Sequence, residues 1–194
     1  MKSMIRRAAA LAALAAMTVA AAAEETRVKV ETSMGDFVIA LDTEKAPQTT
    51  ANFLQYVDDG HYNRTIFHRV VSDFVVQGGG YSRYYRERAT RPPIAYEGGN
   101  GLKNLRGSVA MARQISPNSA AAQWYVNLKD NPKLDHVDDA LGVKPGYAVF
   151  GAVIEGLETV DAIGAVATGP GGPFDSEVPL TPVIILSVER VEAD

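Results

Sequence analysis

Alternation of apolar and polar residues predicts β-strands along most of the chain. The segment 27–33 (RVKVETS) repeats with a period of two residues, which is typical of a strand with one buried face. Met34-Gly35-Asp36 predicts a turn, and the apolar segment 37–41 resumes the strand, so that the two form a hairpin. Further strands are expected at 65–71, 74–77, 107–113, 123–128, 147–153 and 183–191.

Two stretches follow a helical period instead. The first begins at Ala46-Pro47, because proline is tolerated at the first helical position, and Phe53, Leu54 and Val57 share one face before Gly60 ends it. Residues 157–163 predict a second, shorter helix. Eight strands and two helices favour a closed antiparallel barrel, because closure removes the exposed edges of a sheet.

Three segments are expected to be irregular. Residues 81–101 are polar and contain paired prolines and glycines, which predicts a long surface loop, and 168–182 predicts a connection rich in glycine and proline. Gly78-Gly79-Gly80 predicts a tight turn at the end of a strand. It is not followed by the lysine and helix that a phosphate-binding loop requires.

The first 23 residues predict a cleaved signal peptide. Lys2, Arg6 and Arg7 give a basic start, a mostly alanine run extends over 8–23, and small residues precede Glu24. The alternative is a membrane anchor, but alanine is weakly apolar and the run is shorter than the roughly 20 apolar residues of a spanning helix. The expected mature protein, 24–194, is one domain without a membrane segment, in the periplasm or secreted.

Composition excludes several kinds of chemistry. A net charge of −4 argues against binding to nucleic acid, and the lack of cysteine excludes disulfides and thiolate nucleophiles. The histidines at 61, 68 and 136 lack metal-ligand spacing, and no dinucleotide fingerprint or G-x-S-x-G elbow is present. An enzyme with this sequence is therefore expected to work without a metal, cofactor or covalent nucleophile.

Three motifs resemble those of cyclophilins. Residues 67–80 read FHRVVSDFVVQGGG, with an arginine, an aromatic residue, a glutamine and glycines at the family's offsets. Residues 107–113 (GSVAMAR) are followed by Ser119 and by QWYV at 123–126. A third match joins LDH at 134–136 to YAVFGAV at 147–153. The resemblance covers about 28–191, which is nearly the whole mature chain.

The resemblance implies a mainly β fold, a closed eight-stranded antiparallel barrel capped by two helices, with a proline-binding groove on its outer face. It implies a peptidyl-prolyl cis/trans isomerase without a cofactor, whose partners are proline-containing unfolded or flexible polypeptides. Arg69 matches the catalytic arginine. The implied substrate-binding residues are Phe74, Val75, Tyr125, Leu134 and Tyr147 around the proline ring, Gln77 and Gln123 as hydrogen-bonding groups, and Met111, Ala112 and Arg113 along the peptide.

Several positions depart from the family pattern. Val75 stands where a longer methionine is common, and Tyr125 replaces the usual phenylalanine, so its hydroxyl must stay solvated or find a partner. Tyr147 replaces the histidine of animal members. Lys133 stands where those members carry tryptophan, which predicts weak binding of cyclosporin.

Two other functions compete with the isomerase. A proline-binding chaperone module with little catalysis would share the groove, but it would have no need of Arg69. A small-ligand barrel of the lipocalin type needs an interior cavity. Trp124 is expected to fill the barrel, because neighbouring strand residues point to opposite faces and Tyr125 faces outward.

Overall fold

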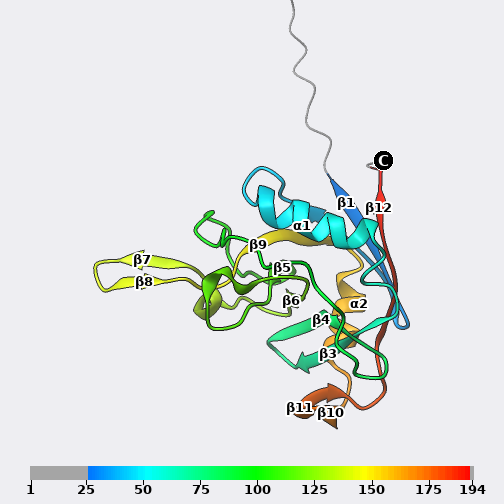
Figure 1. Ribbon diagram of the computed structural model, residues 1–194. Coiled ribbons are helices and arrows are strands. Elements are labelled where there is room, and N and C mark those ends of the chain that lie inside the picture. The colour runs from blue at the N-terminus through cyan, green and yellow to red at the C-terminus, as the bar shows by residue number, and fades with distance from the viewer. Residues whose placement is uncertain (1–25, 193–194) are drawn as a thin grey trace, which may run out of the picture.

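The computed structural model describes residues 26–192, which form the predicted mainly β fold (Figure 1). Eight strands close an antiparallel barrel in the order β1-β12-β3-β4-β6-β5-β9-β2, which confirms the predicted architecture. The signal peptide predicted for 1–23 lies outside the described residues. The barrel strands are β1 (Arg27–Thr32), β2 (Gly35–Leu41), β3 (Thr65–Val71), β4 (Val75–Ser82), β5 (Ser108–Met111), β6 (Trp124–Asn127), β9 (Val149–Glu155) and β12 (Ile184–Val191).

Helices α1 (Pro47–Asp58) and α2 (Leu157–Gly164) cover the barrel, and both were predicted (Figure 1). Apolar side chains of both helices join the barrel core. Trp124 is fully buried there, with its ring in edge contact with Phe37, Phe53 and Phe67 at centroid distances of 6.4, 6.0 and 5.7 Å. Side chains therefore fill the interior, which excludes the lipocalin-type cavity. In the range 26–192 neither helix has the length and hydropathy needed to cross a membrane.

The long loop after β4 is anchored to the start of α1 by a carboxylate. Ala46, the residue before the helix, has no side chain that could cap it. Glu97 fills that role from the loop, accepting hydrogen bonds from the backbone N–H groups of Gln48 and Thr49 at 3.0 and 2.7 Å. A negative charge at this end also suits the helix dipole. The loop is thereby held against the start of α1.

The predicted turn at the three glycines is wrong, because β4 continues through them to Ser82. A Cβ atom at Gly78 would lie 2.8 Å from the Phe67 ring, and one at Gly80 would lie 2.5 Å from the Gln123 side-chain nitrogen. These glycines are needed for close packing across the sheet rather than for chain reversal. Gly80 in particular leaves the space that the Gln123 side chain occupies.

Two hairpins formed by segments 137–144 and 168–179 were not predicted. The expected connection at 168–182 contains β10 (Thr168–Gly171) and β11 (Phe174–Pro179), and β11 lies against β3. A second hairpin, β7 (Val137–Asp139) and β8 (Gly142–Lys144), projects from the barrel (Figure 1). The short 3-10 turns η1 (Pro117–Ser119) and η2 (Pro132–Leu134) complete the fold.

Candidate active site

Three of the predicted site residues, Arg69, Gln77 and Tyr125, lie in one row across the outside of the barrel. The strand register pairs Arg69 of β3 with Gln77 of β4, Gln77 with Tyr125 of β6, Tyr125 with Ala110 of β5, and Ala110 with Val149 of β9. Paired residues on neighbouring strands share a face of the sheet, so these side chains form a continuous outer surface. Residues far apart in sequence are thereby brought together.

Two side chains fix the direction of the Arg69 guanidinium group. Its Nε donates to Glu177 Oε2 at 2.6 Å, and its Nη1 donates to Gln77 Oε1 at 3.4 Å. An arginine carries five N–H donors, so within residues 26–192 three of them are left for a ligand. Glu177 belongs to the β10–β11 hairpin and was not predicted. No local motif marks it, because it lies 108 positions from Arg69 in the sequence.

Gln77 and Gln123 form a linked pair beside Arg69. Gln77 Nε2 donates to Gln123 Oε1 at 3.0 Å, so the chain of hydrogen bonds runs from Arg69 through Gln77 to Gln123. The sequence-based expectation that these residues hold Arg69 or bind substrate is compatible with this arrangement. Rigid partners of this kind keep the guanidinium fork in one orientation, which a flexible ammonium group would not maintain.

A small apolar cluster lies beside the guanidinium group, separate from the barrel core, and its buried members include Val75 and Tyr125. The outer surface of this cluster is the candidate proline pocket. Phe74 lies under the arginine, with Arg69 Cζ 5.9 Å from its ring centroid. Leu134 and Tyr147 pack against the same cluster. The five residues predicted to surround a proline ring therefore lie together.

Arg113 closes the far end of the pocket. Its guanidinium carbon lies 4.7 Å from the Tyr147 ring centroid, and its Nε donates to the Gly146 carbonyl oxygen at 2.8 Å. Ala112, the next residue toward β5, packs against the pocket cluster, and its backbone N–H donates to the Gln123 carbonyl oxygen at 2.9 Å. Both residues border the groove, as expected.

Met111 does not lie in the groove, which corrects its assignment as a substrate-binding residue. Its side chain is 1% exposed and belongs to the barrel core with Trp124. The cause is strand alternation: Ala110 and Ala112 face the groove, so the residue between them faces inward.

A hydrogen-bonded network supports the pocket floor. The Tyr125 hydroxyl donates to Asn104 Oδ1 at 2.8 Å, and Asn127 Nδ2 donates to the same oxygen at 3.2 Å. Asn131 Nδ2 donates to Asn127 Oδ1 at 2.8 Å and to the Phe74 carbonyl oxygen at 3.0 Å. Burial raises the pKa of Tyr125, so its hydroxyl remains a donor. The hydroxyl thus has a buried partner, and the network links Tyr125 through three asparagines to the backbone of Phe74.

Replacing Tyr125 with phenylalanine therefore affects folding more than turnover. Asn104 Oδ1 keeps its bond from Asn127, so no buried acceptor is left alone, and we expect the free energy of unfolding to fall by about 1 kcal/mol. We expect kcat/KM on a short X-Pro peptide to stay within about twofold. Chemical denaturation and a peptide assay check both values. A tenfold loss of activity at unchanged stability would assign the hydroxyl a role in catalysis.

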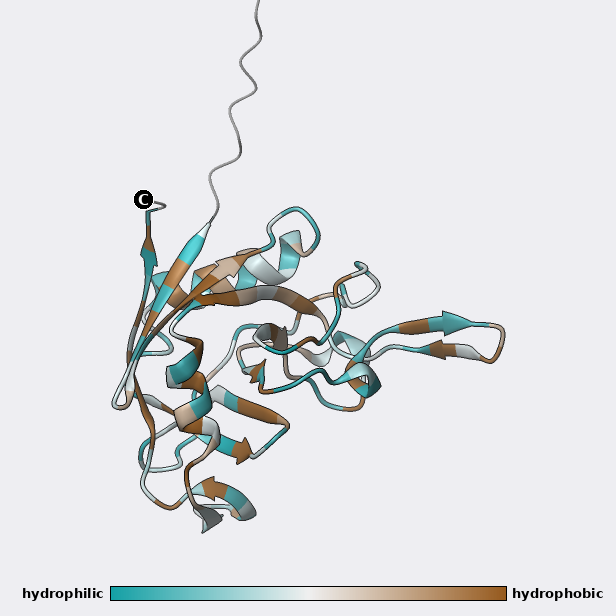
Figure 2. Ribbon diagram, turned by 180° about the vertical axis from the view of Figure 1, so that it is seen from behind, coloured by the Kyte–Doolittle hydropathy of each residue, from teal (hydrophilic) through white to brown (hydrophobic). Residues whose placement is uncertain are grey.

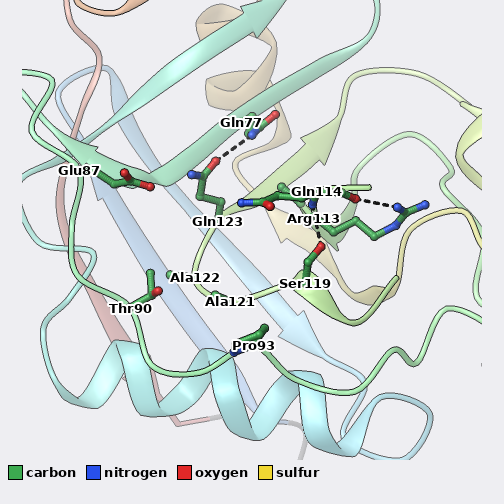
Figure 3. Close-up of a pocket in the computed structure, with 11 residues that line it drawn as sticks. Gln77, Glu87, Thr90, Pro93, Arg113, Gln114, Ser119, Ala121, Ala122 and Gln123 are labelled. Atoms are coloured by element: carbon green, nitrogen blue, oxygen red, sulfur yellow. Dashed lines mark hydrogen bonds between the residues drawn. The ribbon is translucent and has the colours of Figure 1, made fainter. Parts of the chain in front are cut away.

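A hollow of about 340 Å³ lies beside the glutamine pair and is bordered by Ala112 and Arg113 (Figure 3). Gln114 is fixed at its edge, because its backbone N–H donates to Ser119 Oγ at 2.9 Å. Glu87 supplies an exposed carboxylate on the opposite side (Figure 3). Sequence reasoning missed this hollow, because its lining comes mostly from loops without a periodic pattern. The lining residues not predicted are Glu87, Thr90, Pro93, Gln114, Ser119, Ala121 and Ala122.

His68, the neighbour of Arg69, supports the site without carrying charge. Burial lowers the pKa of His68 to about 4, so the ring is neutral at pH 7. The ring packs against Tyr81 and Phe174, at centroid distances of 4.8 and 5.5 Å, and those two rings also contact each other. Because Phe174 belongs to β11, this contact holds the β10–β11 hairpin, and with it Glu177, against β3.

Comparison with known proteins identifies this arrangement. A family profile described as cyclophilin type peptidyl-prolyl cis-trans isomerase/CLD matches residues 27–190. The chain belongs to the cyclophilin family. This cyclophilin is 45% identical over 172 residues to peptidyl-prolyl cis-trans isomerase A of Dickeya dadantii, covering 89% of this chain and 88% of that protein. It is 47% identical over 161 residues to peptidyl-prolyl cis-trans isomerase B of Escherichia coli, covering 83% and 97%. The predicted enzyme class is confirmed.

Solved structures agree with the fold of this cyclophilin. A crystal structure of a Cryptosporidium parvum cyclophilin type peptidyl-prolyl cis-trans isomerase matches with a TM-score of 0.69 and 26% identity, covering 88% of this chain and 99% of that chain. A second structure of that protein, determined in the presence of the dipeptide ala-pro, matches with a TM-score of 0.67.

Proposed function

We propose that this cyclophilin accelerates rotation about X-Pro bonds in exported polypeptides as they fold, and that Arg69 is its catalytic residue. The observation that carries the proposal is the position of Arg69. Its guanidinium group is held by Glu177 and Gln77 beside an apolar cluster that contains the five residues expected to surround a proline ring.

The reaction needs no bond to break. Rotation about a peptide bond is opposed by C–N resonance, with a barrier of about 18–20 kcal/mol. Uncatalysed exchange of an X-Pro bond takes about 10–100 s, although the two planar states differ by only roughly 1 kcal/mol. A catalyst must therefore stabilise the twisted state more than either planar state.

Arg69 distinguishes the twisted state by hydrogen bonding. In that state the prolyl nitrogen loses conjugation and regains a lone pair, which can accept a hydrogen bond. The planar amide nitrogen is a poor acceptor. Arginine stays protonated at any working pH, and its remaining N–H groups are directed by the bonds to Glu177 and Gln77.

The apolar pocket contributes in two ways. Phe74, Leu134 and the Tyr125 ring offer surface for the proline ring, which fixes the rotating bond relative to Arg69. The twisted amide is also less charge-separated than the planar amide, so it loses less when water is excluded. Both effects favour rotation over tight binding of either planar isomer.

The competing function is a chaperone module that binds proline-containing segments and catalyses little. The two functions are separated by magnetisation-exchange NMR on a short X-Pro peptide. The isomerase speeds cis/trans exchange at substoichiometric protein concentration, whereas the chaperone module shifts resonances without speeding exchange.

We also propose weak cyclosporin binding, since the exposed Lys133 offers little apolar contact.

Export to the periplasm is the remaining part of the proposal, and it depends on the basic and alanine-rich leader. We expect mass spectrometry of the protein from the native bacterium to show an N-terminus near Glu24 in the soluble fraction. Secretion into the medium would give the same N-terminus in the culture supernatant. An intact Met1 in a membrane fraction would contradict a cleaved leader.

A further inference from the structure

The β7–β8 hairpin is inserted between two residues of the proline pocket. Leu134 precedes it and Tyr147 follows it, and the Tyr147 backbone N–H donates to the Leu134 carbonyl oxygen at 2.9 Å. All six strand residues of the hairpin are exposed, and it extends away from the barrel (Figure 1). The hairpin therefore begins and ends at the pocket wall but contributes nothing to the barrel core.

The base of the hairpin is firmly attached to the pocket. Lys144 Nζ donates to the Lys133 carbonyl oxygen in η2. Gly146 has a φ of +60°, and a Cβ atom there would collide with the Asp135 backbone, so the segments before β7 and after β8 pack backbone against backbone. These two segments form the stem of the hairpin, which therefore leaves the barrel at the candidate proline pocket.

Apolar side chains are unusually exposed at this end of the groove. Leu141 at the hairpin tip and Ile115 are both 98% exposed, the highest values among large apolar residues in the described range, and Val143 is 64% exposed. Figure 2 shows hydrophobic residues on both strands of the hairpin. Exposed apolar groups gathered beside a binding groove are typical of an interaction surface.

Arg113 connects the two exposed segments. Its Nε donates to the Gly146 carbonyl oxygen at 2.8 Å, and its Nη1 donates to the Ile115 carbonyl oxygen at 3.1 Å. The loop of Ile115 and the stem of the hairpin thus meet around one side chain, which also covers the Tyr147 ring. Both exposed segments therefore start beside Arg113 and Tyr147, at one end of the candidate proline pocket.

We propose that residues 137–144 and Ile115 form a flank arm, which binds apolar residues next to the X-Pro bond in an unfolded polypeptide. This inference rests on the proposed function, because the bound chain is the substrate itself. The arm offers apolar side chains and the unpaired edges of a two-stranded sheet, to which an extended chain can add. An unfolded segment supplies both the extended backbone and the apolar residues that folded proteins bury.

Three peptides with the same X-Pro core test the flank arm. The first is short, the second is longer with apolar residues on both sides, and the third has serine in those flanking positions. We expect wild-type kcat/KM to be about fivefold higher for the apolar-flanked peptide than for the other two, with a matching gain in affinity. The double substitution Leu141→Ser and Val143→Ser should remove this preference and leave the short peptide unaffected.

Leu186→Ser is the matched control, because Leu186 is 49% exposed on β12, away from the groove. It should keep the preference for apolar flanks. Affinity is measured by titration, independently of turnover. A lack of isomerisation would therefore overturn the proposed function, whereas the affinities for the three peptides would still test the flank arm. Equal affinity for all three peptides, or an unchanged preference in the double variant, would overturn the arm. A dimer that the double variant converts to monomers would assign the surface to a second copy instead.

Discussion

Replacing Arg69 with alanine is expected to lower kcat/KM on a short X-Pro peptide by about 10²- to 10³-fold, which corresponds to roughly 3–4 kcal/mol of lost transition-state stabilisation. A charge-assisted hydrogen bond is worth about 1.5–3 kcal/mol, and more in a groove that excludes water. The loss should fall on kcat, because the bond to the prolyl nitrogen forms mainly in the twisted state. Steady-state kinetics with the peptide measures it.

Arg69→Lys should recover little of this activity. An ammonium group keeps the charge, but its three N–H donors radiate from a single nitrogen and lack the planar fork whose direction Glu177 and Gln77 fix in arginine. The control is thermal stability, since Arg69 is partly exposed on the outer face and its ion pair contributes little to folding. If Arg69→Ala works at the wild-type rate with an unchanged melting temperature, catalysis does not depend on the arginine.

Loss of the Glu177 side chain is expected to lower kcat by about 10- to 30-fold with little change in KM, because a misdirected guanidinium group weakens only the transition-state contact. Glu177 Oε2 accepts the hydrogen bond from Arg69 Nε at 2.6 Å, whereas the bond to Gln77 is long at 3.4 Å. Glu177 also has a φ of +66°, an unfavourable conformation for a residue with a side chain, which its surroundings hold in place. Kinetics of Glu177→Ala measures this positioning role.

Two further variants distinguish the positioning of Arg69 by Glu177 from a general effect of changing the charge of this hairpin. Glu177→Gln keeps an acceptor oxygen at similar reach, so it should retain most of the activity that the alanine variant loses. Asp175→Asn removes an exposed charge from the same hairpin, and it should behave as the wild type. A wild-type kcat in Glu177→Ala, or an equal loss in Asp175→Asn, would contradict a specific role for Glu177.

The barrel could be predicted because its strands bury one face. Alternation over 27–33 and 37–41 follows directly from that burial, and the buried side chains of these strands keep the same period. The β10–β11 and β7–β8 hairpins could not be found this way. Their strands are short, rich in glycine, proline or charge, and mostly exposed, so no periodic burial marks their residues.

The residues of the candidate site could be predicted where they belong to strand motifs. They could not be predicted where the fold places a residue distant in sequence next to Arg69. Arg69 and Gln77 lie on adjacent strands in one motif, whereas Glu177 comes from a hairpin that has no sequence pattern. Strand alternation also explains why Met111 is not a groove residue: Ala110 and Ala112 face outward, so Met111 faces the core. In the same way Trp124 faces the core and its neighbour Tyr125 faces outward. The partner of the Tyr125 hydroxyl, Asn104, lies in a loop whose path the sequence does not specify.

Exchange of a bound peptide gives the most direct test of catalysis by Arg69. The rate of cis/trans interconversion on the protein is measured by NMR at saturating X-Pro peptide, for the wild type and Arg69→Ala, together with the dissociation constant of each. We predict that the dissociation constants agree within about threefold while the bound-state interconversion slows by about 10²-fold or more in the variant. Equal interconversion rates on the two proteins, with the peptide bound to both, would contradict catalysis by Arg69.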